Sequence, residues 1–448
     1  MEQDSAFLPG LSPIEGKDLI ARFDGGRVSS NGGVLVLRQI ERKLGIASAL
    51  AACLPDSRDP ARIHHRQDEM IRARMLAIAC GHEDGGDLDT LRTDPALKLA
   101  CGRLPQSGGD LASQPTLSRL ENEPSWRDLA RMGLAMIDLF CDSFSRLPDR
   151  IVLDIDETVD PVHGQQELAF YNAHYATLCF LPICIFEAGT GKPVTALLRP
   201  GKTPTGKEAA NIVAHVTRRI RANWPRVEIG WRGDGHYAAP EVMQTLERLD
   251  CSYILGLGGN GVLKKIAAPW CEDAALRQLG KADPEAKLRR FHQTDYQAGS
   301  WDRPRKIVAR VEAGPMGVDV RFAVTNLPGR AKHLYERAYC ARGRAENMIK
   351  DLKTYTASDR TSCHRWQANQ FRLFEHMGAY WLLLGLRQAA PRNSPWRKAT
   401  FDTLRNTFIK IAARVEEMKT RVVIALPSSY PNQKTLAYIT ARIAAQGP

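Results

Sequence analysis

Hydrophobic and polar residues alternate along this chain with two different periods, and the period changes near residue 150. Before that point, apolar residues recur at steps of three and four residues, which is the spacing of an amphipathic helix. The pattern predicts helices at 33–44, 67–80, 88–99 and 126–140. Turn-rich breaks separate these stretches, so the first third of the chain is predicted to be mainly helical.

From residue 150 the pattern changes to short β-rich runs with two helical stretches between them. Strands are predicted at 151–156, 176–186, 193–199, 227–231 and 253–257, and helices at 207–222 and 239–249. The order is therefore β-β-β-α-β-α-β, which is the order of the ribonuclease H-like core. A core of that kind needs one further helix bearing an acid to complete its site.

The remaining chain is predicted as a β-rich insertion followed by helices. Runs at 306–311 and 318–325 predict strands, and they follow a patch in which cations alternate with aromatic rings, including Trp301. Cations hold a nucleic-acid backbone and rings stack on unpaired bases, although a small β-domain with core aromatics and a basic rim fits equally well. Later stretches predict helices at 366–387 and 401–419, a strand at 422–426 and a last helix.

Composition points to an anionic partner. The chain has 448 residues, 44% of them hydrophobic, and a formal net charge of +12, for which nucleic acid is the leading explanation. Its ten cysteines include no C-x2-C pair, so they indicate neither a zinc site nor a disulfide framework, and a reducing cytoplasm fits. The longest apolar stretch, at 380–386, is too short to span a bilayer, so no membrane role is expected.

One unbroken stretch, 339–353, carries a distinctive set of charges. Placed on a helix at 100° per residue, Arg342, Glu346 and Lys353 fall within about 40° of one another, with Tyr339 at the edge of that sector. Such a face offers a carboxylate for a divalent metal and cations for phosphate oxygens. The alternative is an exposed helix laced with Glu–Lys pairs.

Three acids stand where a phosphodiester-cleaving site would need them. Asp156 ends the first predicted strand, Asp234 follows the fourth, and Glu346 lies on the late helix. Two divalent ions can activate a nucleophile and relieve charge on a leaving oxygen when carboxylates from separate elements converge on them. Asp154 is also acidic and lies on the same strand face as Asp156, so geometry alone leaves both open.

These motifs resemble those of bacterial insertion-sequence transposases of the DDE class. The resemblance covers the Y-x2-R-x3-E-x6-K spacing from Tyr339 to Lys353, the D-x-T at 156–158, the D-G-x-Y at 234–237 and the Thr-Asn-Leu at 325–327. The sequence segments 94–99 and 111–120 resemble those of one subgroup of these transposases, called DDE group 1. The resemblance implies that Asp156, Asp234 and Glu346 together bind two ions of Mg²⁺ or Mn²⁺. Asp156 is preferred to Asp154 because it occupies the D-x-T position.

The same resemblance implies the DNA contacts and the partners. Tyr339, Arg342 and Lys353 would hold the transposon end, and Lys350 in the same stretch and Trp301 in the insertion are further candidates. The partners would be double-stranded DNA with terminal inverted repeats and target DNA, held by a homodimer in the bacterial nucleoid. The freed 3′-hydroxyl would attack either the opposite strand, giving a hairpin, or target DNA.

The predicted division of the chain follows from these patterns. We expect a helical DNA-binding region at 1–148, the two parts of the ribonuclease H-like core at 149–258 and 331–390, a β-rich insertion at 259–330 and a C-terminal helical region at 391–448. The fold class expected is α/β.

Three other interpretations are considered. Asp154 and Asp156 match the D-x-D-x-T motif of haloacid dehalogenase-like phosphatases, with Asp154 as nucleophile, but no later paired acidic motif follows Asp234. Residues 201–208 nearly complete a phosphate loop, yet Glu208 stands where Ser or Thr would bind Mg²⁺, so a turn is predicted. A DNA-binding protein without catalysis is the third alternative, and the presence of all three acids gives no reason to prefer it.

Overall fold

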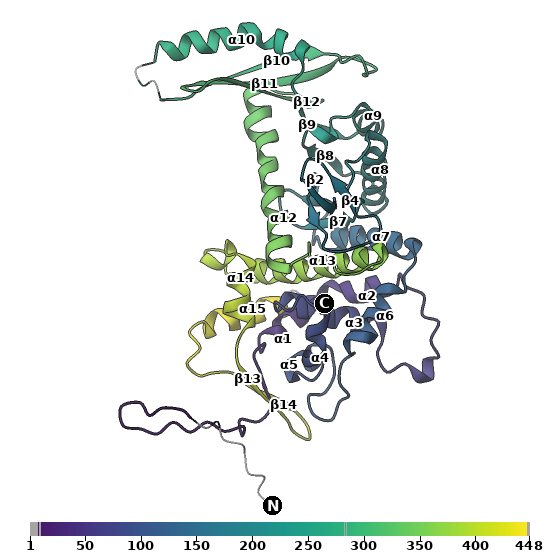
Figure 1. Ribbon diagram of the computed structural model, residues 1–448, viewed down its shortest axis with the longest axis vertical. Coiled ribbons are helices and arrows are strands. Elements are labelled where there is room, and N and C mark those ends of the chain that lie inside the picture. Colours follow the sequence, from purple (N-terminus) through teal and green to yellow (C-terminus); the bar gives the residue numbers. More distant parts are fainter. Residues whose placement is uncertain (1–7, 9, 282, 284, 446–448) are drawn as a thin grey trace, which may run out of the picture. The chain divides into compact units, whose positions relative to one another are not determined.

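Residues 8, 10–281, 283 and 285–445 are described by a computed structural model (Figure 1). The chain forms two compact units. The first unit contains Met1–Pro124, Tyr355–Ala357 and Gly378–Pro448, and the second contains Ser125–Thr354 and Ser358–Met377. Among the described residues, no helix is both long enough and apolar enough to cross a membrane.

The second unit is built on one eight-stranded mixed sheet, in the order β10-β11-β12-β9-β8-β2-β6-β7. Its middle strands β2, β8 and β9 are parallel, and the other neighbours are antiparallel. The strands are β2 (Arg150–Glu157), β6 (Ile183–Glu187), β7 (Pro193–Leu197), β8 (Glu228–Gly233), β9 (Ser252–Leu257), β10 (Leu288–Tyr296), β11 (Arg305–Gly314) and β12 (Gly317–Thr325).

The helices between these strands complete the predicted ribonuclease H-like order. After β2, β6 and β7, helix α8 (Gly206–Asn223) leads to β8, and α9 (Pro240–Arg248) leads to β9. Figure 1 shows α8 and α9 on one face of the sheet and α12 (Gly343–Thr356) on the other. On the α8 face, Trp231 of β8 donates from Nε1 to Oγ1 of Thr217 at 3.2 Å, and Leu153 beside it on β2 is fully buried. The prediction of an α/β fold is confirmed.

The strand predicted at 176–186 is in fact two strands. β5 (Thr177–Phe180) pairs with β3 (Asp160–Pro161) and β4 (Phe170–Asn172) in a small separate sheet, and β6 begins at Ile183 in the main sheet. Pro182, which lies between them, has no N–H to donate to a sheet, so the ladder breaks there.

The insertion opens with a helix that the sequence pattern did not predict. Helix α10 (Gly261–Leu279) precedes β10 and packs on the insertion strands, where the rings of Trp270 and His292 stack at 4.7 Å. Its apolar residues are not gathered on one side, and it contains Pro269, so the usual helical signals are weak. The predicted strands β11 and β12 are present, and β12 joins the insertion to the core through β9.

The stretch 339–353 was predicted as one regular helix, and this prediction is wrong. Tyr339 is the last residue of a π-helical segment η4 (Leu334–Tyr339), which follows α11 (Ala331–His333). A 3₁₀ turn η5 (Cys340–Arg342) comes next, and α12 begins only at Gly343. A π-helical turn departs from the regular α-helical hydrogen bonding and is often found at functional sites. Here the carbonyl of Ala338 accepts a hydrogen bond from Nη1 of Arg232 at 3.1 Å. Tyr339 and Arg342 therefore precede α12, whereas Glu346 and Lys353 belong to it.

The first unit combines the two ends of the chain. Strand β1 (Val28–Ser29) pairs with β13 (Ala413–Glu417), which pairs with β14 (Val422–Ala425). The helix predicted at 401–419 is wrong beyond residue 409: α14 (Phe401–Leu404) and the π-helical η7 (Arg405–Ile409) are followed by β13. The carbonyls of Ile409 and Ile411 accept hydrogen bonds from Gly33 and Gly32, which diverts the chain into the small sheet.

The helix predicted at 88–99 is in fact two short helices, separated by a turn at 92–94, and the other predicted N-terminal helices are present. The first unit holds α1 (Val34–Leu44), α2 (Ile46–Ala51), α3 (Gln67–Ala79), α4 (Leu88–Leu91), α5 (Pro95–Ala100), α6 (Gln114–Asn122) and α15 (Gln433–Ala445), with 3₁₀ turns η1 (Pro60–Arg62), η2 (Gly85–Asp87) and η6 (Pro395–Arg397). The second unit holds α7 (Trp126–Asp142) and the 3₁₀ turn η3 (Gly235–Tyr237), and α13 (Trp366–Ala389) has residues in both units.

Candidate active site

The three acids singled out in the sequence come from three elements of the second unit. Asp156 lies near the end of β2, Asp234 directly follows β8, and Glu346 is in the first turn of α12. Strands β2 and β8 are parallel, with Asp154 beside Arg232, so their carboxyl ends meet at one edge of the sheet. Asp234 caps the next turn, because its Oδ1 accepts from the backbone N–H of His236 at 3.0 Å. Ligand sites of open α/β sheets form at that edge.

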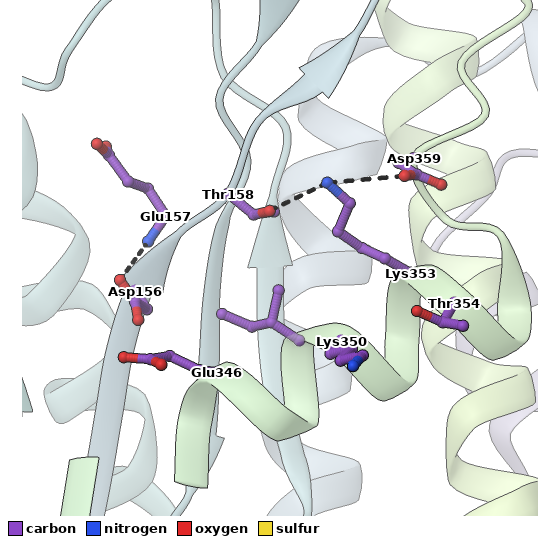
Figure 2. A pocket seen from close by; sticks show the side chains of 9 residues that line it. Asp156, Glu157, Thr158, Glu346, Lys350, Lys353, Thr354 and Asp359 are labelled. Atoms are coloured by element: carbon purple, nitrogen blue, oxygen red, sulfur yellow. Dashed lines mark hydrogen bonds and ion pairs between the residues drawn. The ribbon is translucent and has the colours of Figure 1, made fainter. Parts of the chain in front are cut away.

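Asp156 and Glu346 face one another across a cation. Nη1 of Arg342 lies 2.9 Å from Oδ2 of Asp156, and Nη2 lies 3.2 Å from Oε1 of Glu346. Figure 2 shows the two carboxylates pointing toward each other from β2 and α12. Arg342 and Glu346, which share one side of the predicted helix, are thus joined to Asp156 near the end of β2. Asp156 precedes Arg342 by 186 positions in the chain.

The electrostatics of Asp156 couple the three acids. Burial raises the pKa of Asp156 to about 7; Arg342 opposes the rise, and the charges of Asp234 and Glu346 add to it. A carboxyl group poised near neutrality by burial and like charges is typical of functional sites. The arrangement therefore concentrates negative charge at the end of β2, where Arg342 partly balances it.

A cavity of about 420 Å³ opens beside this pair (Figure 2). Asp156 and Glu346 line it together with Lys350, Lys353 and Asp359. Lys350 is exposed, and among the described residues it has no ion pair. A polyanionic ligand reaching the acids would therefore meet this cation at the rim.

Lys353, in contrast, is held inside the fold. Its Nζ lies 3.2 Å from Oγ1 of Thr158, 3.3 Å from Oδ1 of Asp160 and 3.6 Å from Oδ2 of Asp359, and it also donates to the carbonyl of Val159. Asp160 is almost fully buried, and burial raises its pKa to about 7 against the opposing charge of Lys353. Lys353 therefore ties α12 to the segment that follows Asp156.

Asp154, the other acid on the same strand face, has a different environment. It is completely buried, and both its oxygens accept from Arg232, at 2.6 and 2.7 Å. Burial raises the pKa of Asp154, and Arg232 opposes that rise. Because Arg232 also donates to Ala338, the pair connects β2 and β8 with the segment leading to Arg342 and Glu346.

Two further residues lie at the site without having been singled out in the sequence. Nδ1 of His236 is 3.0 Å from Oε1 of Glu157 and 3.4 Å from Oδ2 of Asp234. Burial raises the pKa of Glu157. The only sequence signal was position, since Glu157 directly follows Asp156 and His236 is two residues after Asp234.

The two predicted aromatic contacts have different surroundings. Tyr339 is close to the acids, because its hydroxyl and the backbone of Asp234 both lie against Gly256 of β9. A Cβ placed on Gly256 would lie 2.6 Å from the Tyr339 hydroxyl and 3.2 Å from the carbonyl carbon of Asp234. Burial raises the pKa of Tyr339. Trp301 is only 6% exposed and packs edge-on against Tyr296 at 5.4 Å, inside the insertion. It is not among the residues that line the cavity at Asp156.

The near-match to a phosphate loop at 201–208 is a helix start. Thr205 caps α8 by accepting from the N–H of Glu208, and Glu208 pairs with Arg199 at 2.7 Å. A Cβ at Gly206 would lie 2.4 Å from Oε2 of Glu241, so an acid is adjacent to the turn. A turn was predicted here; the structure has a bend at 201–202 and then the start of α8 at Gly206.

Comparison with known proteins places the chain. The family model described as transposase DDE domain group 1 matches residues 11–448. No curated protein matches the chain. The match to the transposase family model favours the transposase interpretation over the phosphatase alternative based on Asp154.

Two solved structures are similar to parts of the chain. One is the cryo-EM structure of a piggyBac transposase synaptic complex with hairpin DNA, at 10% identity over 84% of this chain and 80% of that one, with a TM-score of 0.43. The other is the crystal structure of a pre-cleavage Mos1 transpososome, at 13% identity over 50% of this chain and 68% of that one, with a TM-score of 0.17. By its match along almost its whole length, the chain belongs to the DDE domain group 1 family of transposases.

Proposed function

We propose that Asp156, Asp234 and Glu346 form the catalytic centre with which this transposase cuts and rejoins DNA at the ends of an insertion sequence. The observation that carries the proposal is the meeting of Asp156 and Glu346. They come from elements far apart in the chain, face each other at one cavity, and with Asp234 raise the local negative charge. Hydrolysis at each transposon end would free a 3′-hydroxyl. Its oxygen would then attack a phosphodiester of target DNA, forming a new bond to phosphorus while the 3′-hydroxyl of the target strand leaves, which completes cut-and-paste movement.

The donor set fits a divalent metal of the Mg²⁺ or Mn²⁺ type. Carboxylate oxygens are the ligands these ions prefer, and three come from separate elements at one sheet edge. Among the described residues, no three Asp, Glu, His or Cys side chains are already grouped closely enough to hold an ion. We propose that the three acids hold two ions, which supply Lewis acidity at the phosphodiester. Arg342 balances the charge of Asp156 and Glu346 in the arrangement described above.

The cations and aromatics near the acids are proposed to position the DNA. Lys350, exposed at the rim of the cavity, would contact a phosphate directly, and Tyr339 and Arg342 would hold the transposon end beside the acids. Lys353 would act at the same end of the DNA through its hold on α12. Trp301, as a candidate for stacking, would have to leave its packing against Tyr296.

The parts of the chain are proposed to divide the task as follows. Residues 1–148 would bind the inverted repeat, 149–258 and 331–390 would cut, 259–330 would guide the DNA, and 391–448 would support the N-terminal region. The chain's positive charge suits double-stranded DNA and a place in the bacterial nucleoid. A homodimer would pair the two transposon ends.

The test is cleavage of a labelled duplex carrying the element's own inverted repeats, with Mg²⁺ or Mn²⁺. We expect metal-dependent nicking at the repeat boundary that is lost in Glu346→Gln while DNA binding is retained. Glu336→Gln is the matched control, because Glu336 is an exposed glutamate on the preceding segment and does not line the cavity. Equal cleavage by Glu346→Gln and the intact protein would overturn the assignment. Phosphatase activity lost in Asp154→Asn would restore the rival enzyme class.

A further inference from the structure

A second cavity, of about 570 Å³, lies on the same face of the sheet as the acids but at the other end of the parallel strands. Val152 of β2, Gly230 of β8 and Ser252 of β9 line its floor, and residues of α11, η4 and α12 line its wall. Along β2, residues 152, 154 and 156 share one face. The buried Asp154–Arg232 pair therefore separates this cavity from the acids.

The floor of the cavity at Gly230 is covered by the side chains of its neighbours, because this central strand has no side chain of its own there. A Cβ on Gly230 would lie 3.0 Å from Oγ of Ser252 and 3.7 Å from Cγ2 of Val152. The same Cβ would lie 3.8 Å from Nη2 of Arg150, so that guanidinium reaches over the floor. A ligand in the cavity therefore meets the hydroxyl of Ser252 and the guanidinium of Arg150 above Gly230.

The charges around the cavity are mostly positive and uncompensated. Arg150, Arg337 and Arg344 line it, and among the described residues none of these three guanidinium groups has a hydrogen bond or an ion pair. Its remaining arginine, Arg232, is paired with Asp154. The glutamate in the lining, Glu187, is occupied by its own turn, accepting from the N–H of Gly189 at 2.8 Å and of Thr190 at 2.7 Å.

We infer that this cavity, the Arg150–Arg337 groove, binds a phosphate group, and that the backbone of the DNA being processed supplies it. Guanidinium groups suit phosphate because their N–H donors form paired hydrogen bonds with its oxygens. The choice of DNA as the source rests on the proposed function. The alternative source of the same chemistry is the phosphate of a mononucleotide, for which the cavity has room.

The position of the groove predicts which phosphate it holds. Val152 precedes Asp156 by four residues and Arg150 precedes it by six, which at about 3.3 Å per residue places the groove about 13–20 Å from the acids. With one base pair per about 3.4 Å of duplex, that distance corresponds to about four to six base pairs from the cleaved bond. Ethylation of phosphates in that interval should interfere with binding.

The test measures DNA binding by the full chain over a range of salt concentrations. The probe is the labelled inverted-repeat duplex, and the variant is Arg150→Ala with Arg337→Ala. Loss of two phosphate contacts should make the slope of log K against log salt shallower by about 1.8, and weaken binding on the order of tenfold or more at 0.1 M salt. Lys332→Ala is the matched control, because Lys332 is an exposed cation on α11 that does not line the groove.

A second variant separates the groove from general positive charge. Val152→Trp keeps every charge and fills the floor, so it should weaken DNA binding while the circular dichroism spectrum remains that of the intact protein. The mononucleotide arm uses dAMP as a competitor and as a direct ligand. Binding of dAMP that is lost in the double variant, with an unchanged DNA salt slope, would support the groove as a phosphate site but assign it to a nucleotide.

The outcomes distinguish this inference from the proposed function. If the intact protein cleaves the duplex and the double variant matches it in affinity, salt slope and dAMP binding, the groove assignment is overturned while the transposase proposal stands. An equal loss in Lys332→Ala would also overturn it, because any cation would then serve. If the intact protein neither binds nor cleaves the duplex, the proposed function fails, and dAMP binding still decides whether the groove is a phosphate site.

Discussion

Two aspartates that share one face of β2 have opposite surroundings. Asp154 is fully buried and accepts two hydrogen bonds from Arg232, whereas Asp156 borders a cavity opposite Glu346. Removing one partner of a buried ion pair leaves the other charge uncompensated, which typically costs about 3–5 kcal/mol. Asp154 is thus held by Arg232 inside the fold, and we propose that Asp156 is the one that takes part in the chemistry.

We expect Asp154→Asn to lower the free energy of unfolding by about 3 kcal/mol, because it leaves the Arg232 guanidinium without its carboxylate. Thermal unfolding followed by circular dichroism measures the effect. The paired variant Asp154→Leu with Arg232→Met, which removes both charges, should recover most of the loss. An Asp154→Asn variant as stable as the parent would contradict the assigned role.

Asp156→Asn should behave in the opposite way, with a defined pH dependence. The pKa of Asp156 is about 7 in the fold and close to the ordinary aspartate value of 3.8 when unfolded, so the folded state binds the extra proton between those values. Stability therefore falls as pH rises from about 4 to 7, by at most about 4 kcal/mol at about 1.4 kcal/mol per pKa unit. Asparagine removes that loss.

The measurement compares the melting temperatures of Asp156→Asn and the parent at several pH values without added metal. The variant should be at least as stable as the parent at pH 8, and its advantage should shrink to nothing near pH 4. A variant that is less stable than the parent at pH 8 would show that the pairing with Arg342 outweighs the burial of the charge.

At the scale of single residues, the acids could be predicted from the sequence, but the side chains that pair with them could not. Spacing and family resemblance named Asp156, Asp234 and Glu346, and strand alternation correctly put Asp154 and Asp156 on one face. The choice between them depends on Arg232, which is brought beside Asp154 by the register of β2 with β8. Nothing in a single strand's sequence encodes that register.

Among the elements, α12 carries two lysines one turn apart with different tasks. Lys350 is exposed at the rim of the cavity, while Lys353 contacts Thr158, Asp160 and Asp359. The contacts of Lys353 fix the helix against the chain that follows Asp156. The position of Glu346, two turns earlier on the same helix, depends on them.

We expect Lys353→Met to reduce the free energy of unfolding by about 3 kcal/mol, because it leaves the buried Asp160 without its ion-pair partner. The same variant should slow cleavage more than it weakens DNA binding. Lys350→Met, the matched control, should change stability by less than about 0.5 kcal/mol while making the salt slope of DNA binding shallower by about 0.9. Thermal unfolding and binding titrations on both variants provide the comparison. The reverse pattern, with Lys353→Met stable but weak in binding, would make Lys353 a direct DNA contact.

Elements with clear periodicity were predicted, and those shaped by contacts elsewhere were not. The order of strands and helices in the core followed from alternation and from helical spacing. The π-helical segment before α12 was missed because its shape accompanies the bond from Arg232 to Ala338, a contact between distant positions. Helix α10 was missed because its apolar residues are spread around it and Pro269 lies inside it.

At the scale of the whole molecule, the first unit is assembled from both ends of the chain. Val28 of β1 pairs with Arg414 of β13, and Nε of Arg405 donates to the carbonyl of Ala79 at 2.9 Å. A reading of the sequence in order treats these ends as separate regions. Only the pairing of distant strands shows that they share one core.

We therefore expect residues 1–124 alone to lack a cooperative thermal transition. The same segment joined through a flexible Gly-Ser linker to residues 378–448 should regain one, because the linked fragment restores β13 and the carbonyl partners of Gly32 and Gly33. Circular dichroism melts of the two fragments measure the difference. Cooperative unfolding of 1–124 alone, at the temperature of the linked form, would show that the N-terminal segment has a sufficient core of its own.

A point substitution in the full chain tests the same assembly without cutting it. A Cβ on Gly33 would lie 1.8 Å from the carbonyl oxygen of Phe408, so the two segments touch backbone to backbone. Gly33→Ala must push them apart, and overpacking of this kind costs about 1–3 kcal/mol or more. Gly25→Ala is the control, since its Cβ would meet only Val28 at 3.9 Å. If both variants melt like the parent, the two ends of the chain do not depend on this contact.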